Sequence, residues 1–197
     1  SLEYKNLTRK ILSIKDNEFI KIDFPNENGE LEFFSLKEIQ TLSKEVQTKY
    51  PNIRTFRGYS DSRKNVILRI TYSPLGLSGS LRTPKGFVFL QPQMGSSTNH
   101  IFYTSSRHNY IGEKLFCKTN LLKINSSVKK NDNKKSNKNT NRTPKSFKIA
   151  IAASGEYTEY WGDNNDQNGS NSSDAFAAVV STINRLNEIM EVDLGIK

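Results

Sequence analysis

The sequence is interrupted by a segment that cannot fold by itself. Residues 123–148 contain nine Lys or Arg side chains and one acid, Asp132, and no large apolar side chain lies between Val128 and Phe147. This composition buries too little apolar surface to offset the entropy that the chain loses on ordering. We therefore predict a basic flexible linker at 123–146, which separates a block at 1–122 from a block at 147–197.

The linker carries most of the positive charge of the chain. The net charge is +9, from 29 Lys and Arg against 20 Asp and Glu, but outside residues 123–148 only 20 bases face 19 acids. A nucleic-acid-binding face needs bases gathered on a folded surface, often with aromatic residues between them. We therefore predict no nucleic-acid partner. No apolar run reaches the roughly 20 residues that span a bilayer, so we also predict no membrane partner.

The first block has the apolar alternation of β-strands. We expect a hairpin through residues 20–24 and 31–33, a helix over 36–49, a strand over 66–72, a second hairpin through 77–81 and 87–90, and a further strand over 100–104. The turn sequences between these runs contain Pro and Gly, which favour chain reversal. The block is predicted to be a small β-rich module.

The second block changes to a different pattern. Residues 147–153 form an apolar run suited to a buried strand, and 155–161 begin a turn or helix. After a polar loop, Ser173 or Asp174 is the expected N-cap of an amphipathic helix that Gly195 ends. One strand and one helix do not make a domain, because the apolar stripe of the helix needs a sheet to pack on. The predicted fold class is α+β, with a truncated second domain.

Two groups of residues resemble a known enzyme family. Residues 148–158 (KIAIAASGEYT) and 183–189 (INRLNEI) resemble the mature start of bacterial reprolysin-like zinc metallopeptidases, which belong to the metzincin group, and residues 50–58 (YPNIRTFRG) and 71–77 (TYSPLGL) resemble their propeptide. The resemblance implies a secreted, extracellular precursor. In it, residues 1–122 are a propeptide module, and residues 147–197 are the first strand and helix of an α/β metzincin catalytic domain.

The resemblance implies zinc as the cofactor of the full-length enzyme and none for this chain alone. Such enzymes hold zinc through three histidines of an extended HExxH helix, whose Glu acts as general base. This chain contains only His100 and His108, which lack that spacing and that Glu. We therefore assign no catalytic residue and no metal site among the histidines, and we expect the chain to be inactive as a peptidase by itself.

Cys117 is the candidate inhibitory zinc ligand that the resemblance implies. It is the single cysteine and lies just before the linker, where latent metzincins commonly present a propeptide thiolate to the zinc. Zinc deprotonates a coordinated thiol, and sulfur is a good ligand for this ion. From the residues alone, a buried and unreactive cysteine remains the alternative.

The linker is the predicted activation cleavage region. Exposed, polar and disordered segments are preferred sites of proteolysis. The basic residues that an activating protease would recognise are Lys129, Lys130, Lys134, Lys135, Lys138, Arg142 and Lys145. The predicted function is a propeptide that keeps its own catalytic domain latent. Assistance in the folding of that domain is a further hypothesis. The partners are therefore that domain and the activating protease.

A second function remains open. The chain is alternatively a β-rich extracellular binding or adhesion module with a basic linker. In that case Tyr59, Tyr72 and Tyr103 would form a ligand platform, although aromatic residues in strands more often fill a core or an edge.

Overall fold

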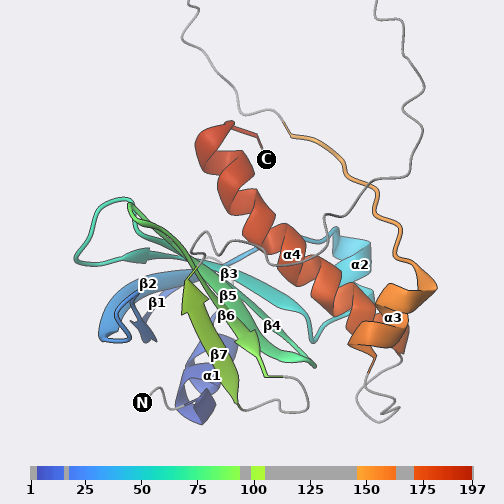
Figure 1. The fold of residues 1–197 in the computed structure, drawn as a ribbon, viewed down its shortest axis with the longest axis horizontal. Helices are drawn as coiled ribbons and strands as arrows, with labels where there is room; N and C mark the ends of the chain where they lie inside the picture. Colours follow the sequence, from blue (N-terminus) through green and yellow to red (C-terminus); the bar gives the residue numbers. More distant parts are fainter. Residues whose placement is uncertain (1–3, 16–17, 94–98, 105–145, 163–170, 197) are drawn as a thin grey trace, which may run out of the picture.

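The fold is one twisted antiparallel sheet with a helix on each of its faces (Figure 1). The computed structural model describes residues 4–15, 18–93, 99–104, 146–162 and 171–196. The predicted linker, apart from Ser146, lies outside the described residues. The α+β, β-rich fold class predicted from the sequence is confirmed at this level.

The sheet has seven strands, and each pairs with its neighbour in sequence in the order β1-β2-β3-β4-β5-β6-β7. Their bounds are β1 Phe19–Pro25, β2 Leu31–Ile39, β3 Arg54–Ser60, β4 Ile67–Ser73, β5 Gly76–Thr83, β6 Gly86–Pro92 and β7 His100–Thr104. Both predicted hairpins are present, because β1 pairs with β2 and β5 pairs with β6. Gly76 and Gly86 adopt positive φ at the turns that open β5 and β6, which favours glycine there.

Four helices accompany the sheet. Their bounds are α1 Tyr4–Leu12, α2 Lys44–Lys49, α3 Gly155–Trp161 and α4 Asn171–Asp193. Helix α1 lies against one face of the sheet and α4 crosses the other, while α2 and α3 lie near the start of α4 (Figure 1). Gly195 follows α4 with a φ of 64°, as expected for a residue that ends a helix.

The face of the sheet that α1 covers holds the main apolar core. Alternate residues of the strands point to this face, and Leu7, Ile11 and Ile14 of the α1 segment pack on them. The buried sheet residues of this core are Ile22, Phe24, Phe34, Leu36, Phe56, Val66, Leu68, Ile70, Leu77, Leu81, Val88 and Leu90. No residue of α4 belongs to this core cluster. The core is therefore complete within the first block.

The part of the opposite face that lies beneath α4 is polar although it is buried. Arg69, Thr71, Ser78 and Ser80 project from β4 and β5 on this side and are each at most 8% exposed. They lie beneath α4, which contacts β4 and β5. The two faces therefore differ in chemistry. One is an apolar core, whereas the other has a buried polar layer beneath α4, next to the aromatic side chains of Phe87, Phe89 and Tyr103.

The predicted helix over 36–49 is wrong in its first half. Residues 31–39 form β2, and Leu36 is fully buried in the core through strand alternation with Phe34. The helix is restricted to the six residues of α2, whose N-cap is Ser43. Pairing with β1 and β3 on both sides outweighs the local helical spacing in 36–39.

The predicted buried strand over 147–153 is also wrong. The segment is extended but pairs with no described strand, and Phe147, Ile149 and Ile151 are 66%, 65% and 47% exposed. The predicted N-cap at Ser173 or Asp174 lies inside α4, which begins at Asn171. The turn or helix predicted at 155–161 is the helix α3.

Candidate functional site

The most specific feature of the described structure is the contact between α4 and the polar face of the sheet. We name the residues Arg57, Arg69, Thr71, Ser78 and Arg82, together with the carbonyl of Ile70, the docking face. The helix presents Ser181, Asn184, Glu188 and Glu191 to it. Their spacing of three, four and three residues places these side chains on one side of a helix. The contact therefore joins one row of polar side chains to another.

Arg69 lies at the centre of the contact. Both Arg69 and Glu188 are 1% exposed, and Nε of Arg69 donates to Oε2 of Glu188 over 2.9 Å. Nη2 of Arg69 also donates to Oε2 of Glu191, over 2.8 Å. A buried guanidinium without a carboxylate is strongly unfavourable, so these acids make the burial of Arg69 possible.

Two further arginines extend the charged row. Nη1 of Arg57, on β3, donates to Oε2 of Glu191 over 2.7 Å. At the other end, Nη2 of Arg82 donates to Oδ1 of Asp193 over 2.7 Å. That hydrogen bond raises the pKa of Arg82 and lowers the pKa of Asp193. Three arginines from three neighbouring strands thus bind three acids of the last turns of α4.

Neutral hydrogen bonds fix the position of the helix along the sheet. Nδ2 of Asn184 donates to the carbonyl oxygen of Ile70 over 2.9 Å and to Oγ1 of Thr71 over 3.0 Å. One turn earlier, the hydroxyls of Ser181 and Ser78 lie 2.5 Å apart. A shift of the helix by one residue would break these bonds, so the contact has a defined register.

The first half of α4 is held differently. Ala177 and Val180 pack with Ile53 in a small apolar cluster that Tyr50 and Phe176 border, and these two rings lie 4.5 Å apart. The apolar cluster anchors one half of the helix, and the charged row anchors the other. Because interfaces between separable parts are more polar than domain cores, the charged half is typical of a contact that can form and dissociate.

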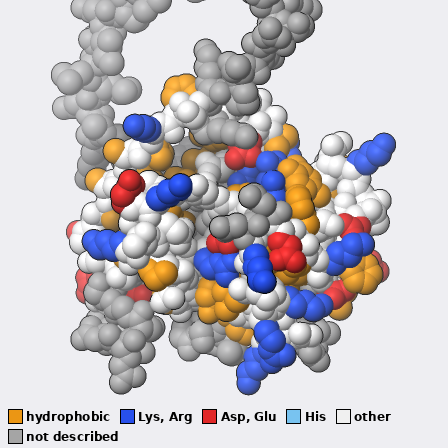
Figure 2. Space-filling view, turned by 180° about the vertical axis from the view of Figure 1, so that it is seen from behind, with side chains coloured by type: hydrophobic (Ala, Val, Ile, Leu, Met, Phe, Trp, Pro, Cys, Tyr) orange, Lys and Arg blue, Asp and Glu red, His pale blue; other side chains and the backbone are white. Residues whose placement is uncertain are grey.

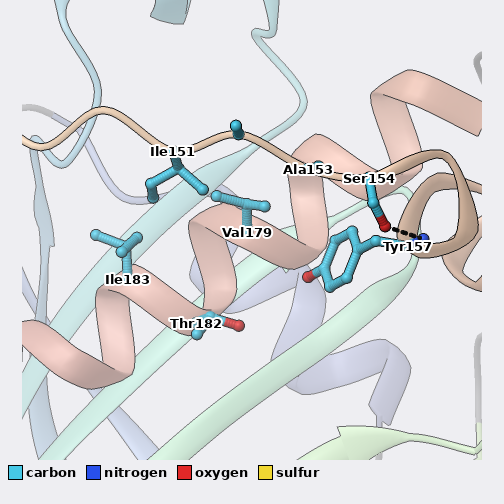
Figure 3. Close-up of a pocket in the computed structure, with 8 residues that line it drawn as sticks. Ile151, Ala153, Ser154, Tyr157, Val179, Thr182 and Ile183 are labelled. Atoms are coloured by element: carbon cyan, nitrogen blue, oxygen red, sulfur yellow. Dashed lines mark hydrogen bonds between the residues drawn. The ribbon is translucent and has the colours of Figure 1, made fainter. Parts of the chain in front are cut away.

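The outer side of α4 borders an apolar pocket of about 390 Å³ (Figure 3). The extended residues 151–154 form one wall, and Val179, Thr182 and Ile183 of α4 form the floor. Figure 3 shows Ile151 lying over Val179 and Ile183. Oγ of Ser154 accepts a hydrogen bond from the backbone nitrogen of Tyr157, which caps α3. The walls are mainly apolar.

The predicted zinc ligand, Cys117, lies outside the described residues. The same holds for His108 and for the cleavage-region residues Lys129, Lys130, Lys134, Lys135, Lys138, Arg142 and Lys145. His100 is in β7, where its ring lies 4.8 Å from that of Tyr4. Among the described residues, no group of three or more His, Cys, Asp or Glu side chains is placed to hold a metal ion.

The three tyrosines considered as a ligand platform do not share one surface. Tyr72 packs against the apolar core on the α1 side of the sheet. Tyr59 and Tyr103 are 42% and 39% exposed on the other side, in β3 and β7. Three strands separate them, so the structure does not bring the three residues together.

The residues of the docking face and their acidic partners are absent from the sequence-based site predictions. A signal for them is present, because Asp174, Ala177, Ser181, Asn184 and Glu188 recur at spacings of three and four on the helix. The prediction for this helix rested on its apolar residues instead. The structure instead buries Asp174, Asn184 and Glu188 to about 1% exposure.

The visible surface carries charges of both signs. Figure 2 shows basic and acidic side chains intermixed with apolar ones rather than gathered in one basic area. No helix in the described part of the chain is long and apolar enough to cross a membrane.

Comparison of the chain with protein-family models, curated proteins and solved structures finds no significant match. The metzincin resemblance therefore remains a prediction that rests on the quoted residues.

Proposed function

We propose that residues 1–122 act as a propeptide that holds the helix of the following block and keeps a secreted zinc metallopeptidase latent. The observation that supports this proposal is the matched contact between the docking face and α4. The partners lie 119 positions apart for Arg69 and Glu188, on opposite sides of the predicted linker. An intramolecular partner of this kind binds at high effective concentration while the linker is intact.

In this proposal Cys117 supplies the inhibitory thiolate and zinc is bound by the catalytic domain. A thiolate bound to that zinc would exclude the water that such a metal activates for attack on the peptide bond. The docking face would contribute by holding the propeptide against the enzyme, so that a short tether presents the thiol. The chain described here then has no peptidase activity of its own.

The test is peptidase activity of the uncut precursor. An HExxH sequence with a third histidine in the native open reading frame beyond Lys197 is the first requirement, and its absence would contradict the proposal. With that site present, Cys117→Ser should raise the activity of the uncut precursor by at least about tenfold, because the zinc regains its water. Thr119→Ser is the matched control and should leave latency unchanged.

A second variant separates thiol ligation from steric blockade. Glu188→Gln together with Glu191→Gln weakens the docking contact without changing the thiol. Activity that rises only in this variant would support blockade by the docked sheet and would contradict the role of Cys117. Activity that stays low in both variants would contradict latency through either route.

A further inference from the structure

The docking face is formed by a part of the protein whose core is complete without the helix. The main apolar cluster draws its buried residues from Leu7 to Leu90, and Phe102 packs against it. Without α4, the arginine, serine and threonine side chains beneath the helix would be solvated, and of the two apolar clusters only the small one around Ile53 would lose apolar contacts. The helix adds no residue to the main core. It meets the first block through the small apolar cluster of Ile53, Ala177 and Val180 and through the polar contact with the docking face.

The chemistry of this face selects its partner. Arg57 and Arg69 share the carboxylate of Glu191, Arg69 also binds Glu188, and Arg82 binds Asp193, so the face binds carboxylates at three places along the helix. An apolar helix in the same position would leave Arg69 buried without a counter-charge, which is strongly unfavourable. An acidic helix in another register would lose the hydrogen bonds of Asn184 to Ile70 and Thr71. The face thus fits a helix with the pattern Ser-x2-Asn-x3-Glu-x2-Glu-x-Asp, as found at 181–193.

We propose that the docking face is a receptor for an acidic helix, and that it binds α4 as a separable ligand. The two blocks then stay associated non-covalently after the chain between them is cut. Cleavage of the linker removes the high effective concentration but none of the contacts. Separation requires a second event, such as a higher ionic strength or a competing acidic helix.

This inference rests on one part of the proposed function, the pairing of the first block with α4. It does not depend on zinc or on Cys117. If the cut pieces separate at once while the uncut precursor is latent, the inference fails and the proposed function stands. If the pieces stay together but no zinc site follows in the reading frame, the proposed function fails and the inference stands.

The experiment uses the full chain with a recognition sequence for a site-specific protease placed between Lys130 and Lys138. After complete cutting, the two pieces are followed by size-exclusion chromatography and native mass spectrometry at about 50 mM and about 500 mM NaCl. We expect one complex at the lower salt concentration. Because the Arg82–Asp193 pair is partly exposed, we expect the dissociation constant to rise by about tenfold at the higher one.

The decisive comparison is between two variants with the same change in charge. Glu188→Gln with Glu191→Gln should raise the dissociation constant of the cut pieces by about 100-fold or more, because it leaves Arg69 without a carboxylate. Glu156→Gln with Glu159→Gln changes two exposed acids of α3 and should leave it unchanged. Circular dichroism of the uncut variants verifies that each is folded before cutting.

A milder variant keeps the test valid if the docking variant does not fold. Asp193→Asn removes one exposed acid at the end of the row, and it should raise the dissociation constant by a few fold. Separation of the wild-type pieces at about 50 mM NaCl would overturn the inference. Equal affinities in the wild type, the docking variant and the control would also overturn it, because the charges would then not select the partner.

Discussion

Arg69 of β4 and Glu188 of α4 form an ion pair in which both side chains are 1% exposed and the bonded atoms lie 2.9 Å apart. Oε1 of the same carboxylate has no hydrogen-bond partner within the described residues. A buried carboxylate that uses only one oxygen depends strongly on its counter-charge. This pair is therefore the point at which the first and second blocks depend most on each other.

Removal of either member of this pair should destabilise the contact, whereas removal of both should cost less. We expect Arg69→Met alone to lower the free energy of unfolding by about 3–5 kcal/mol, since the buried Glu188 carboxylate loses its hydrogen-bonding partner. Glu188→Leu alone should cost less, since Arg69 keeps the Glu191 carboxylate. The double variant should recover a large part of that loss, because no buried charge remains at this position except at Glu191. Urea denaturation of all four proteins in one cycle measures the coupling. Additive losses would show that the two side chains do not act as a pair.

A second prediction concerns pH and the cluster that joins two hairpins. Arg63 binds Glu27 and Glu32. The hydrogen bond from Arg63 lowers the pKa of Glu27. Burial raises the pKa of Glu32, but hydrogen bonds from Arg63, Ser60 and Ser62 together outweigh it and lower this pKa.

The sign of the effect follows from these directions. Because both folded-state pKa values lie below those of the unfolded chain, the stabilisation is present above the unfolded value of about 4.3 and is lost as the pH falls through the folded values. Arg63→Gln should therefore reduce stability at neutral pH and flatten the decline of stability on acidification below about pH 5. Thermal melting from neutral to acidic pH measures this change, with Lys64→Gln as the control. An unchanged slope in Arg63→Gln would contradict the assignment.

A third prediction concerns the close approach of two strands at Gly79. A Cβ atom at this position would lie 2.7 Å from the backbone oxygen of Arg69, which pairing within the sheet holds in place. Gly79→Ala should therefore lower the free energy of unfolding by about 1–3 kcal/mol and displace the strand that carries Arg69. Gly155→Ala is the matched control, because a Cβ atom there would meet nothing within 4 Å and alanine favours a helix. Equal stability of the two variants in urea denaturation would contradict the prediction.

The sequence allowed the hairpins to be predicted because their signals are local. The apolar alternation in 20–24 and 31–33 and the turn between them lie within one short stretch, and the structure pairs these residues as β1 and β2. Strand β3 was not predicted, because Arg54 and Arg57 interrupt its apolar pattern. Arg57 is polar because it faces the helix. The local sequence around β3 contains no sign of this contact with α4.

The docking face could not be predicted either, because its residues and their partners on α4 lie far apart in the sequence. Burial of Glu188 and Asn184 is favourable only with Arg69 and the carbonyl of Ile70 beside them, and these partners lie 114 or more positions away. The apolar residues of α4 gave the stronger local signal. However, Ile189 and Val192 remain 39% and 44% exposed.

The unbroken neighbour-to-neighbour order of the strands has a consequence for folding during synthesis. Each strand from β2 to β7 pairs with the one before it, so the seven-stranded sheet needs no strand after β7, which ends at Thr104. Contacts between neighbours in sequence form quickly, and domains generally fold as they leave the ribosome, beginning at the N-terminus. The arginine row is then in place before α4 is translated. The helix then binds to a sheet that is already folded, so the order of synthesis determines the order of assembly.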